Sequence, residues 1–178
     1  MDLNHLRDTA IFACIIITFY TVSCLEEFTV PSLNKFSNSP NSFIQRHHVF
    51  PVQDHNGLPI LSFHIPTTKC FSAGEMTQCA TLNHLTDPVV WFQNHFNINN
   101  PGESDHLFTW RHPKGLCPLT KLEVTKRIHS IVTQYDLPIL KGHSLRIGGT
   151  LHYLLIGTPF DVIKTMGRWA GDSFTRYL

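Results

Sequence analysis

The chain has 178 residues and 42% of them are hydrophobic, which argues against intrinsic disorder and is enough for one domain with a buried core. Its net charge is only +1, but residues 1–110 hold 4 Lys or Arg against 9 Asp or Glu, whereas residues 111–178 hold 10 against 4. The five cysteines include no CxxC pair and the twelve histidines include no HExxH motif, which argues against a disulfide framework and a structural zinc site.

The two halves of the chain therefore carry opposite charge, −5 (4 − 9) before residue 111 and +6 (10 − 4) from there on. A basic half is typical of proteins that bind an anionic partner, most often DNA or RNA. A charged face exposed to solvent would produce the same excess of basic residues. Charge alone therefore leaves both interpretations open, an anionic partner and a solvated surface. Reduced thiols are the simplest interpretation of an odd number of unpaired cysteines, and they indicate an intracellular protein.

Residues 9–25 form an apolar stretch of 17 uncharged positions, which is shorter than the roughly 20 residues that a membrane span needs. Residues 1–8 carry no net positive charge, so the start of a secretory signal is poorly matched. Polar Thr, Ser, Cys and Tyr residues interrupt the stretch. We interpret residues 2–25 as a buried core helix in preference to a membrane or signal segment.

The next segments predict a loop and then a hairpin. Residues 31–57 are rich in Pro, Asn and Ser and are interpreted as loop. Residues 60–65 alternate between apolar and polar side chains, which is typical of a half-buried strand, and residues 75–82 form a weaker second strand. The two strands predict a β-hairpin with Lys69 near its tip.

Capping residues mark two helix starts in the second half of the chain. Asp87 is an expected N-cap, followed by Pro88 at the first helical position. Thr120 and Glu123 have capping-box spacing and begin a predicted helix that ends at about Tyr135. Its apolar stripe comprises Ile128, Ile131, Val132 and Tyr135.

Three more helices are predicted in the last forty residues. The first begins near His143 and ends at Gly157, and its inward face comprises Ile147, Leu151, Leu154 and Leu155. The second lies between Thr158 and Gly167, and a short last helix begins near residue 172 and carries Tyr177. The expected fold class is α+β, mainly helical with a small antiparallel sheet.

His143 and Arg146 stand at the start of an otherwise apolar predicted helix, on one face because they are three residues apart. A buried arginine is costly unless it meets an anion. Gly148 and Gly149 follow, and two glycines within a helix are tolerated where another backbone or a ligand must come close. A structural ion pair between Arg146 and a carboxylate is the alternative interpretation.

Three motifs together resemble the tyrosine recombinases of the phage-integrase superfamily: "FHIPTTK", "GHSLRIGGTLHYLLIG" and "GRWAGDSFTRYL". The chain is similar to the transposon-related DNA breaking-rejoining enzymes of fungal genomes, from "EEFTVPSL" to its end. "HPKGLCPLTK" is similar to the family's connecting segment. The resemblance implies an integrase-like catalytic domain that acts on DNA.

The resemblance also implies a role for each residue of the motifs, without a cofactor or a metal. Negative charge develops on the phosphate oxygens during strand transfer, and fixed cationic donors stabilise it. The implied catalytic set is Tyr177 as the nucleophile that forms a 3′-phosphotyrosine, Arg146 as one of two phosphate-clamping arginines, His143 as hydrogen-bond donor or proton carrier, Trp169 as indole N–H donor, Lys69 as acid for the leaving 5′-oxygen, and Glu27 as the accompanying acid. Taken singly, Trp169 favours a place in the core, Tyr177 an exposed end and Lys69 a turn, and only the joint pattern favours the catalytic roles.

The sequence departs from the family at its first catalytic arginine. Relatives have a sequence that resembles Arg-Leu-Gly-Glu at this place, whereas this chain has Cys24, Leu25, Glu26 and Glu27. A thiol supplies neither a permanent charge nor a bidentate fork. We therefore expect an impaired enzyme, and a catalytically dead DNA-binding relic of a mobile element is the alternative.

The resemblance further predicts one catalytic domain over residues 1–178, without the helical core-binding domain that precedes it in relatives and without their C-terminal tail. Duplex DNA is the expected partner, together with other recombinase subunits on that DNA, in the nucleus. The expected DNA-binding residues are Lys114, Lys121, Lys141 and Arg168. A small membrane-anchored protein that uses residues 9–25 is the remaining alternative, and no membrane association is expected from the first interpretation.

Overall fold

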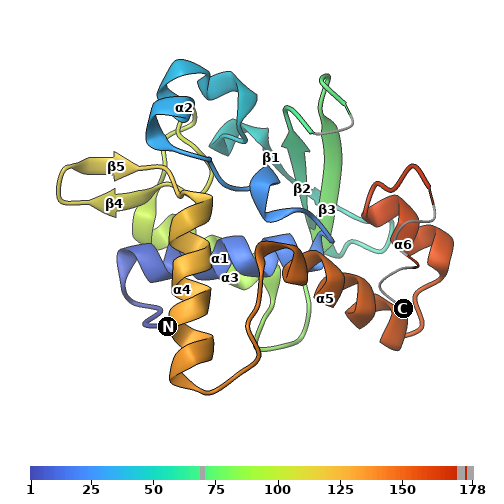
Figure 1. Cartoon of the computed structure of the whole chain (residues 1–178). Coiled ribbons are helices and arrows are strands. Elements are labelled where there is room, and N and C mark those ends of the chain that lie inside the picture. Colours follow the sequence, from blue (N-terminus) through green and yellow to red (C-terminus); the bar gives the residue numbers. More distant parts are fainter. Residues whose placement is uncertain (69–70, 172–174, 176–178) are drawn as a thin grey trace.

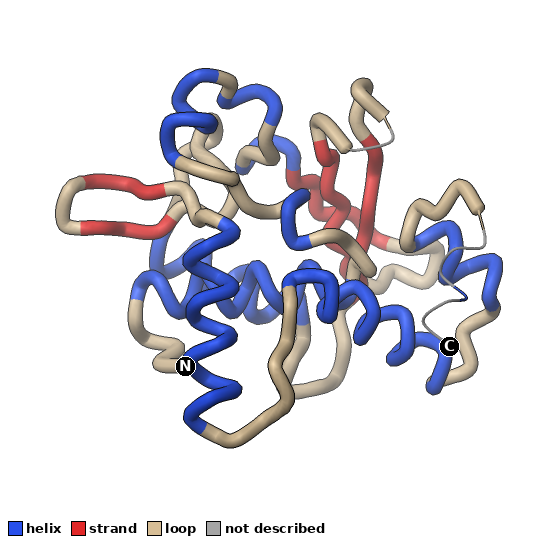
Figure 2. Tube along the Cα trace, viewed as in Figure 1, coloured by secondary structure: helices blue, strands red, loops and turns tan. Residues whose placement is uncertain are grey.

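Helices pack around and beside a small antiparallel sheet, as Figures 1 and 2 show. The computed structural model describes residues 1–68, 71–171 and 175 of the chain. The helices are α1 (Leu6–Tyr20), α2 (Leu33–Asn38), α3 (Pro88–Asn99), α4 (Lys121–Gln134), α5 (Gly142–Leu155) and α6 (Phe160–Met166). The strands are β1 (Val49–Gln53), β2 (Pro59–Ile65) and β3 (Glu75–Ala80) in that spatial order, and β4 (Trp110–His112) with β5 (Gly115–Cys117). The predicted fold class is confirmed.

Helix α1 is the buried helix that the apolar stretch predicts. Ten of its 15 residues are buried, and α3, α4 and α5 all contact it. The helix ends at Tyr20, five residues earlier than predicted, and the chain turns at Val22, whose φ is +50°. In the described part of the chain, no helix is long and apolar enough to cross a membrane.

The prediction of a loop over residues 31–57 is wrong at two places. Ser32 accepts a hydrogen bond from the Lys35 backbone N–H and caps the short helix α2. Strand β1 then pairs antiparallel with β2, with Val49 opposite Phe63. Pro51 lies within β1 and favoured the loop interpretation, but a proline is tolerated in an edge strand because one side of the strand needs no pairing.

The predicted hairpin is present as β2 and β3. Leu61, Phe63 and Ile65 are buried on the inward face of β2, as their alternation predicts. Strand β3 ends at Ala80, two residues before the predicted end. Gly74, with φ +84°, lies close to the Ile65 carbonyl at the start of β3. Lys69, the predicted tip residue, is outside the described residues.

Helices α3 and α4 begin where the capping residues predict. The Asp87 carboxylate accepts from the N–H groups of Val89 and Val90, and Thr120 forms the predicted capping box with Glu123. The predicted stripe of α4 is wrong at Tyr135, which is 64% exposed, because the buried residues are Val124, Ile128 and Val132 at four-residue spacing. The β4–β5 hairpin before α4 was not predicted.

The predicted inward face of α5 is also wrong. Its buried residues are Leu145, Gly149 and Thr150, whereas Leu151 and Leu155 are 44% and 77% exposed. The reason is a close helix contact: a Cβ on Gly149 would lie 2.2 Å from the Phe19 carbonyl oxygen of α1. The backbone approach expected from the two glycines is therefore present at Gly149, and it sets which face of α5 turns inward.

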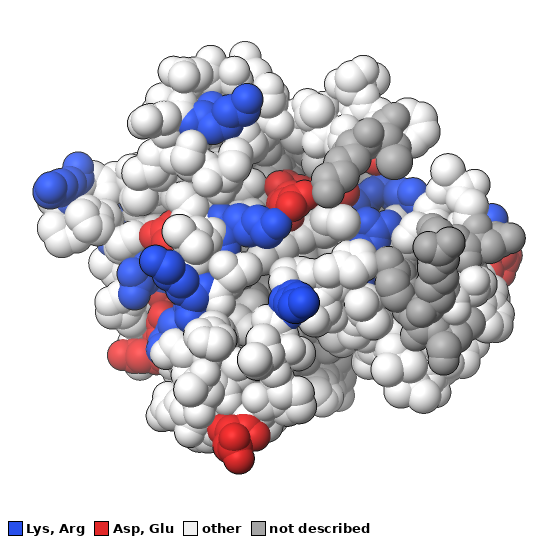
Figure 3. Space-filling model, viewed as in Figure 1, with Lys and Arg blue, Asp and Glu red and all other residues white. Residues whose placement is uncertain are grey.

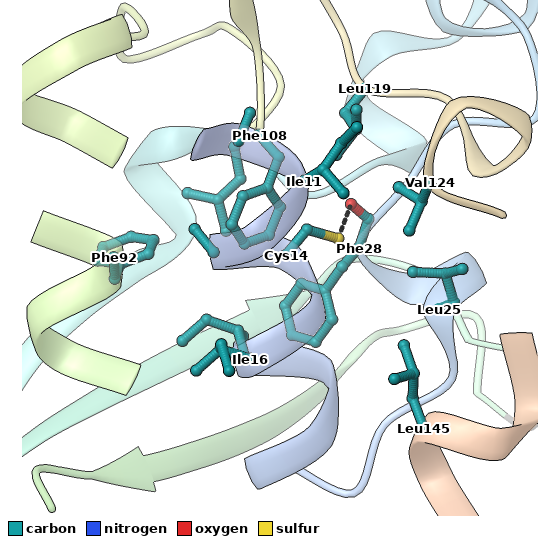
Figure 4. Packing of buried hydrophobic residues seen from close by; sticks show 14 of the residues in the cluster. Ile11, Cys14, Ile16, Leu25, Phe28, Phe92, Phe108, Leu119, Val124 and Leu145 are labelled. Carbon is teal, nitrogen blue, oxygen red and sulfur yellow. Dashed lines mark hydrogen bonds between the residues drawn. The ribbon is translucent and has the colours of Figure 1, made fainter. Parts of the chain in front are cut away.

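The core lies between α1, the sheet and helices α3 and α4, and Figure 4 shows its central residues. Phe28, Phe63 and Phe108 are fully buried and meet edge to face, with ring centroids 5.6 Å and 6.0 Å from that of Phe28. The Cys14 thiol donates to the Phe28 carbonyl, and burial raises the pKa of Cys14 to about 12. Phe28 lies one residue after Glu27, so this packing fixes the segment that enters the candidate site.

Candidate active site

A pocket of about 590 Å³ lies where the segment after α1 meets α5, the end of α6 and the end of the β2–β3 hairpin at which the connecting loop leaves β2 and enters β3. Its lining includes most of the residues that the sequence motifs single out. They are Cys24, Glu26, Glu27, Thr67, Thr68, Glu75, His143, Arg146, Gly167, Arg168, Trp169, Ala170 and Gly171. Segments from opposite ends of the chain therefore meet at one concave place.

Arg146 forms the inner wall of this pocket. One guanidinium nitrogen, Nη1, donates to the Cys24 sulfur at 3.0 Å, and Nη2 donates to the Gly167 carbonyl. The buried Nε of Arg146 has no hydrogen-bond partner among the described residues, and none of their carboxylates lies within ion-pair distance of its guanidinium. A half-buried guanidinium with an unpaired buried nitrogen and no carboxylate partner among the described residues favours an anionic ligand.

Trp169 covers Arg146 from the side of α6. The Arg146 guanidinium carbon lies 4.4 Å from the centroid of the indole ring, which is a cation–π contact. Gly167 makes this placement possible, because a Cβ there would lie 1.9 Å from the Trp169 ring. The glycine that ends α6 thus also positions the tryptophan.

The predicted acid, Glu27, and the predicted degenerate position, Cys24, lie together in the pocket wall. Glu27 Oε2 accepts from the Cys24 backbone N–H at 3.0 Å and from the Arg168 guanidinium. The Cys24 side chain points toward Arg146 rather than into the core. The thiol therefore lies against the Arg146 guanidinium in the pocket wall, and its correspondence to the family's arginine stays a prediction.

Arg168 was predicted to contact DNA, and its side chain lies in the pocket wall, where it is 9% exposed. Its Nη2 pairs with Glu27 at 2.5 Å, its Nε lies 3.8 Å from Glu75, and both terminal nitrogens lie 3.4–3.5 Å from the Ser23 hydroxyl. Sequence reasoning missed Glu75 and Ser23. The one available signal was the position of Glu75, directly after Gly74 at the start of a predicted strand.

The remaining catalytic candidates divide between the pocket and the part of the chain that is not described. His143 lies in the first turn of α5 and lines the pocket on the same side as Arg146, as the three-residue spacing predicts. Lys69, Tyr177 and most of the predicted last helix lie outside the described residues. The assignment of catalytic roles stays a prediction.

The other predicted DNA-binding lysines are spread over the surface. Lys121 pairs with Glu26 at 2.6 Å beside the pocket, Lys114 lies in the β4–β5 turn, and Lys141 is exposed at the start of α5. Figure 3 shows Lys and Arg side chains over α4 and nearer the pocket, with acidic atoms between them. Within the described residues, no group of three His, Cys, Asp or Glu side chains is placed to hold a metal ion.

No protein-family profile and no curated protein sequence matches this chain. Solved structures do match. A point mutant of Flpe in a DNA Holliday junction complex superposes with a TM-score of 0.61 at 13% identity, over 94% of this chain and 39% of the other. The Flpe–Holliday junction complex superposes with a TM-score of 0.61 at 13% identity, over 97% of this chain and 42% of the other.

A third structure, FLP recombinase in a Holliday junction complex, gives a TM-score of 0.59 at 13% identity, over 95% of this chain and 40% of the other. This chain has the fold of a tyrosine recombinase domain. It spans about two fifths of the length of each of these structures. The likeness confirms the integrase-like fold; the activity, the DNA substrate and the extent of the catalytic domain are proposals.

Proposed function

We propose that this chain binds duplex DNA over the pocket and breaks and rejoins a phosphodiester bond through Tyr177. The observation that carries the proposal is Arg146: a half-buried arginine whose buried Nε has no hydrogen-bond partner and whose guanidinium has no carboxylate partner among the described residues, in a pocket shared with His143 and Trp169. The Holliday junction in the similar structures supports DNA as the substrate class.

The proposed reaction is a transesterification. The Tyr177 phenolate oxygen attacks the phosphorus, the bond to the 5′-oxygen breaks, and a 3′-phosphotyrosine remains. His143 takes up the phenolic proton, and Lys69 protonates the leaving 5′-oxygen. Arg146 and the Trp169 N–H stabilise the charge on the non-bridging oxygens, so the reaction uses no metal or cofactor. Rejoining runs the same exchange in reverse.

DNA binding without turnover is the second candidate, and the acidic wall of the pocket favours it. Glu26, Glu27 and Glu75 all line the pocket, and Cys24 takes the place of a cation. Carboxylates near a scissile phosphate repel it. The proposal further places the chain in the nucleus, with other recombinase subunits on the same DNA, as a domain derived from a fungal mobile element.

Covalent trapping distinguishes the two candidates. Duplexes with a nick and a randomised flanking sequence would be incubated with the chain and with Tyr177→Phe, and protein-linked DNA would be isolated under denaturing conditions and sequenced. We expect an adduct with the parent chain and none with Tyr177→Phe. DNA binding with no adduct in either protein would favour the second candidate, and equal adduct in both would remove Tyr177 as the nucleophile.

Binding through phosphates also predicts a steep salt dependence, because each neutralised phosphate releases counterions. Fluorescence anisotropy with a labelled duplex should show affinity falling at least about tenfold between 50 mM and 200 mM salt, which corresponds to at least about two phosphate contacts. An affinity that does not change with salt would contradict binding by the basic side chains of residues 111–178.

A further inference from the structure

We infer that Arg168 supplies the second guanidinium of the phosphate site, in place of the arginine that Cys24 replaces, and that Glu27 and Glu75 hold it there before phosphate arrives. The inference rests on the proposed function of the pocket.

The first support is position. Arg146 donates to Cys24, and Arg168 lies within 3.5 Å of the hydroxyl of Ser23, the preceding residue. Adjacent Cα atoms are about 3.8 Å apart, so the two guanidinium groups lie beside neighbouring residues of one segment. Both line the same pocket. The pocket therefore already holds a second arginine, which reaches the segment from α6 instead of belonging to it.

The second support is the backbone at Arg168. Helix α6 ends in a Schellman motif, with hydrogen bonds from the Arg168 N–H to Thr165 and from the Trp169 N–H to Lys164. Residue 168 has φ +55°, the left-handed conformation that glycine adopts most easily at this point. The chain nevertheless places its glycine one residue earlier, under Trp169. An unfavourable backbone conformation at a residue whose side chain lines a pocket favours a functional role for that side chain.

The third support is the way Arg168 is held. Its contact with Glu27 is short, but Nε lies 3.8 Å from Glu75, beyond hydrogen-bond distance, and the Ser23 contacts are long. The five N–H donors of the Arg168 guanidinium are therefore poorly matched by these acceptors. A phosphate that enters the pocket offers two oxygens to such a fork, and it competes with the two carboxylates for Arg168. Glu27 and Glu75 thus both position the arginine and oppose phosphate.

A purely structural ion pair is the alternative role for Arg168, and a backbone-matched control separates the two. Asp136 also has a left-handed backbone, φ +50°, directly after the last capping residue of α4, and its N–H and that of Leu137 make the same pair of hydrogen bonds. Asp136→Gly and Arg168→Gly relieve the same backbone conformation, but only Arg168→Gly removes a guanidinium from the pocket.

The experiment is a titration with inorganic phosphate, followed by the NMR signal of the Trp169 indole N–H, with thermal unfolding of each variant measured in parallel. We expect Arg168→Gly to weaken phosphate binding at least about tenfold, the effect of losing a charged hydrogen-bond donor. Arg168→Lys should weaken it less, Glu75→Gln should tighten it, and Asp136→Gly should leave it unchanged. A structural role would lower the unfolding temperature of Arg168→Gly without changing the phosphate affinity.

Unchanged phosphate affinity in folded Arg168→Gly, together with loss of affinity in Arg146→Ala, would overturn the inference and leave the phosphate pocket in place. If Arg168→Gly does not fold, the variants Arg168→Lys and Glu75→Gln test the inference instead. Phosphate affinities of both variants that equal that of the parent chain would overturn it. The absence of phosphate binding in the parent chain would also overturn it. The proposed strand transfer is judged separately, by the adduct that Tyr177→Phe removes.

Discussion

Helix α1 and the pair α5–α6 are both rich in apolar residues, but they use them in opposite ways. In α1, 10 of 15 residues are buried, whereas only 3 of 14 are buried in α5 and 1 of 7 in α6. Leu151, Leu155, Ile156, Phe160 and Val162 of the second region are all more than 40% exposed. The first region is a packed scaffold, and the second contributes less to the core.

The pocket lies where these two regions meet. The scaffold side presents Cys24 and Glu27, and the α5–α6 side presents Arg146, Arg168 and Trp169. The polar contacts Arg146–Cys24 and Arg168–Glu27 across the pocket therefore also link the two regions. The packed region therefore fixes one half of the site, while the orientation of the other half depends on a few contacts.

The largest expected effect tests the packing difference directly. Ile17 of α1 is fully buried, and Ile17→Ala should lower the free energy of unfolding by about 2–5 kcal/mol, because it removes buried methyl groups and leaves a cavity. Leu155→Ala in α5 is the matched control. It should change the free energy of unfolding by no more than about 0.5 kcal/mol, since Leu155 is 77% exposed. Urea unfolding measures both. Similar losses would mean that the two regions are equally packed.

Acid should act on two buried histidines, His95 of α3, which packs on α1, and His106 in the loop after α3. Burial lowers the pKa of His95 to about 4 and that of His106 to about 3, whereas an unfolded histidine titrates near 6.5. The unfolded state therefore binds more protons below pH 6.5, so stability is fully present above that pH and is lost as pH falls toward 4. The loss should be on the order of 3 kcal/mol for His95 alone.

Urea midpoints between pH 7 and pH 4 measure this effect. His129→Gln is the control and should not change the profile, because His129 is exposed on α4. Replacing His95 by Gln should flatten it. A profile that stays flat in the parent chain down to pH 4 would contradict the burial of the two histidines.

Gly149 tests the contact between the two regions. Within a helix, Gly→Ala normally stabilises by about 1 kcal/mol, but here the new Cβ would lie 2.2 Å from the Phe19 carbonyl oxygen. We expect Gly149→Ala to destabilise by about 1–3 kcal/mol, because a backbone atom cannot easily move away. Gly148→Ala is the control and should cost less, since its Cβ would meet an edge carbon of the Phe19 side-chain ring at 3.1 Å, which moves more easily than a backbone atom. Thermal unfolding that shows no loss for Gly149→Ala would contradict the close contact.

Local signals predicted much of the fold and only part of the site. The Thr120–Glu123 capping box, the Asp87–Pro88 helix start and the alternation in β2 depend on neighbouring residues, so the sequence contains them. The inward face of α5 depends on the approach of Phe19, more than a hundred residues away, and periodicity cannot show that. The meeting of Ser23, Glu75 and Arg168 has the same origin: three distant segments join only in the folded chain.

The smallest expected effect is that of Cys24→Arg in the parent chain. Sequence reasoning alone favours a large gain in strand cleavage, because the substitution restores the family's arginine beside Glu27. The structure argues otherwise, since Arg168 already lies against the same segment and pairs with Glu27, and Arg146 donates to the Cys24 sulfur. A third guanidinium adds repulsion and has to displace one of the two. We therefore expect little change in the amount of covalent adduct on the randomised nicked duplexes.

The same substitution should have a large effect where Arg168 is absent. Arg168→Gly should lower adduct formation about a hundredfold, the usual effect of losing one preorganised donor, and Cys24→Arg should recover most of it in that background. The four proteins form a double-mutant cycle, with Tyr177→Phe as the blank, and the coupling between positions 24 and 168 should exceed about 1 kcal/mol. Equal gains from Cys24→Arg in both backgrounds would mean that the two residues act independently. In that case the α6 side of the pocket does not replace what the scaffold side lacks.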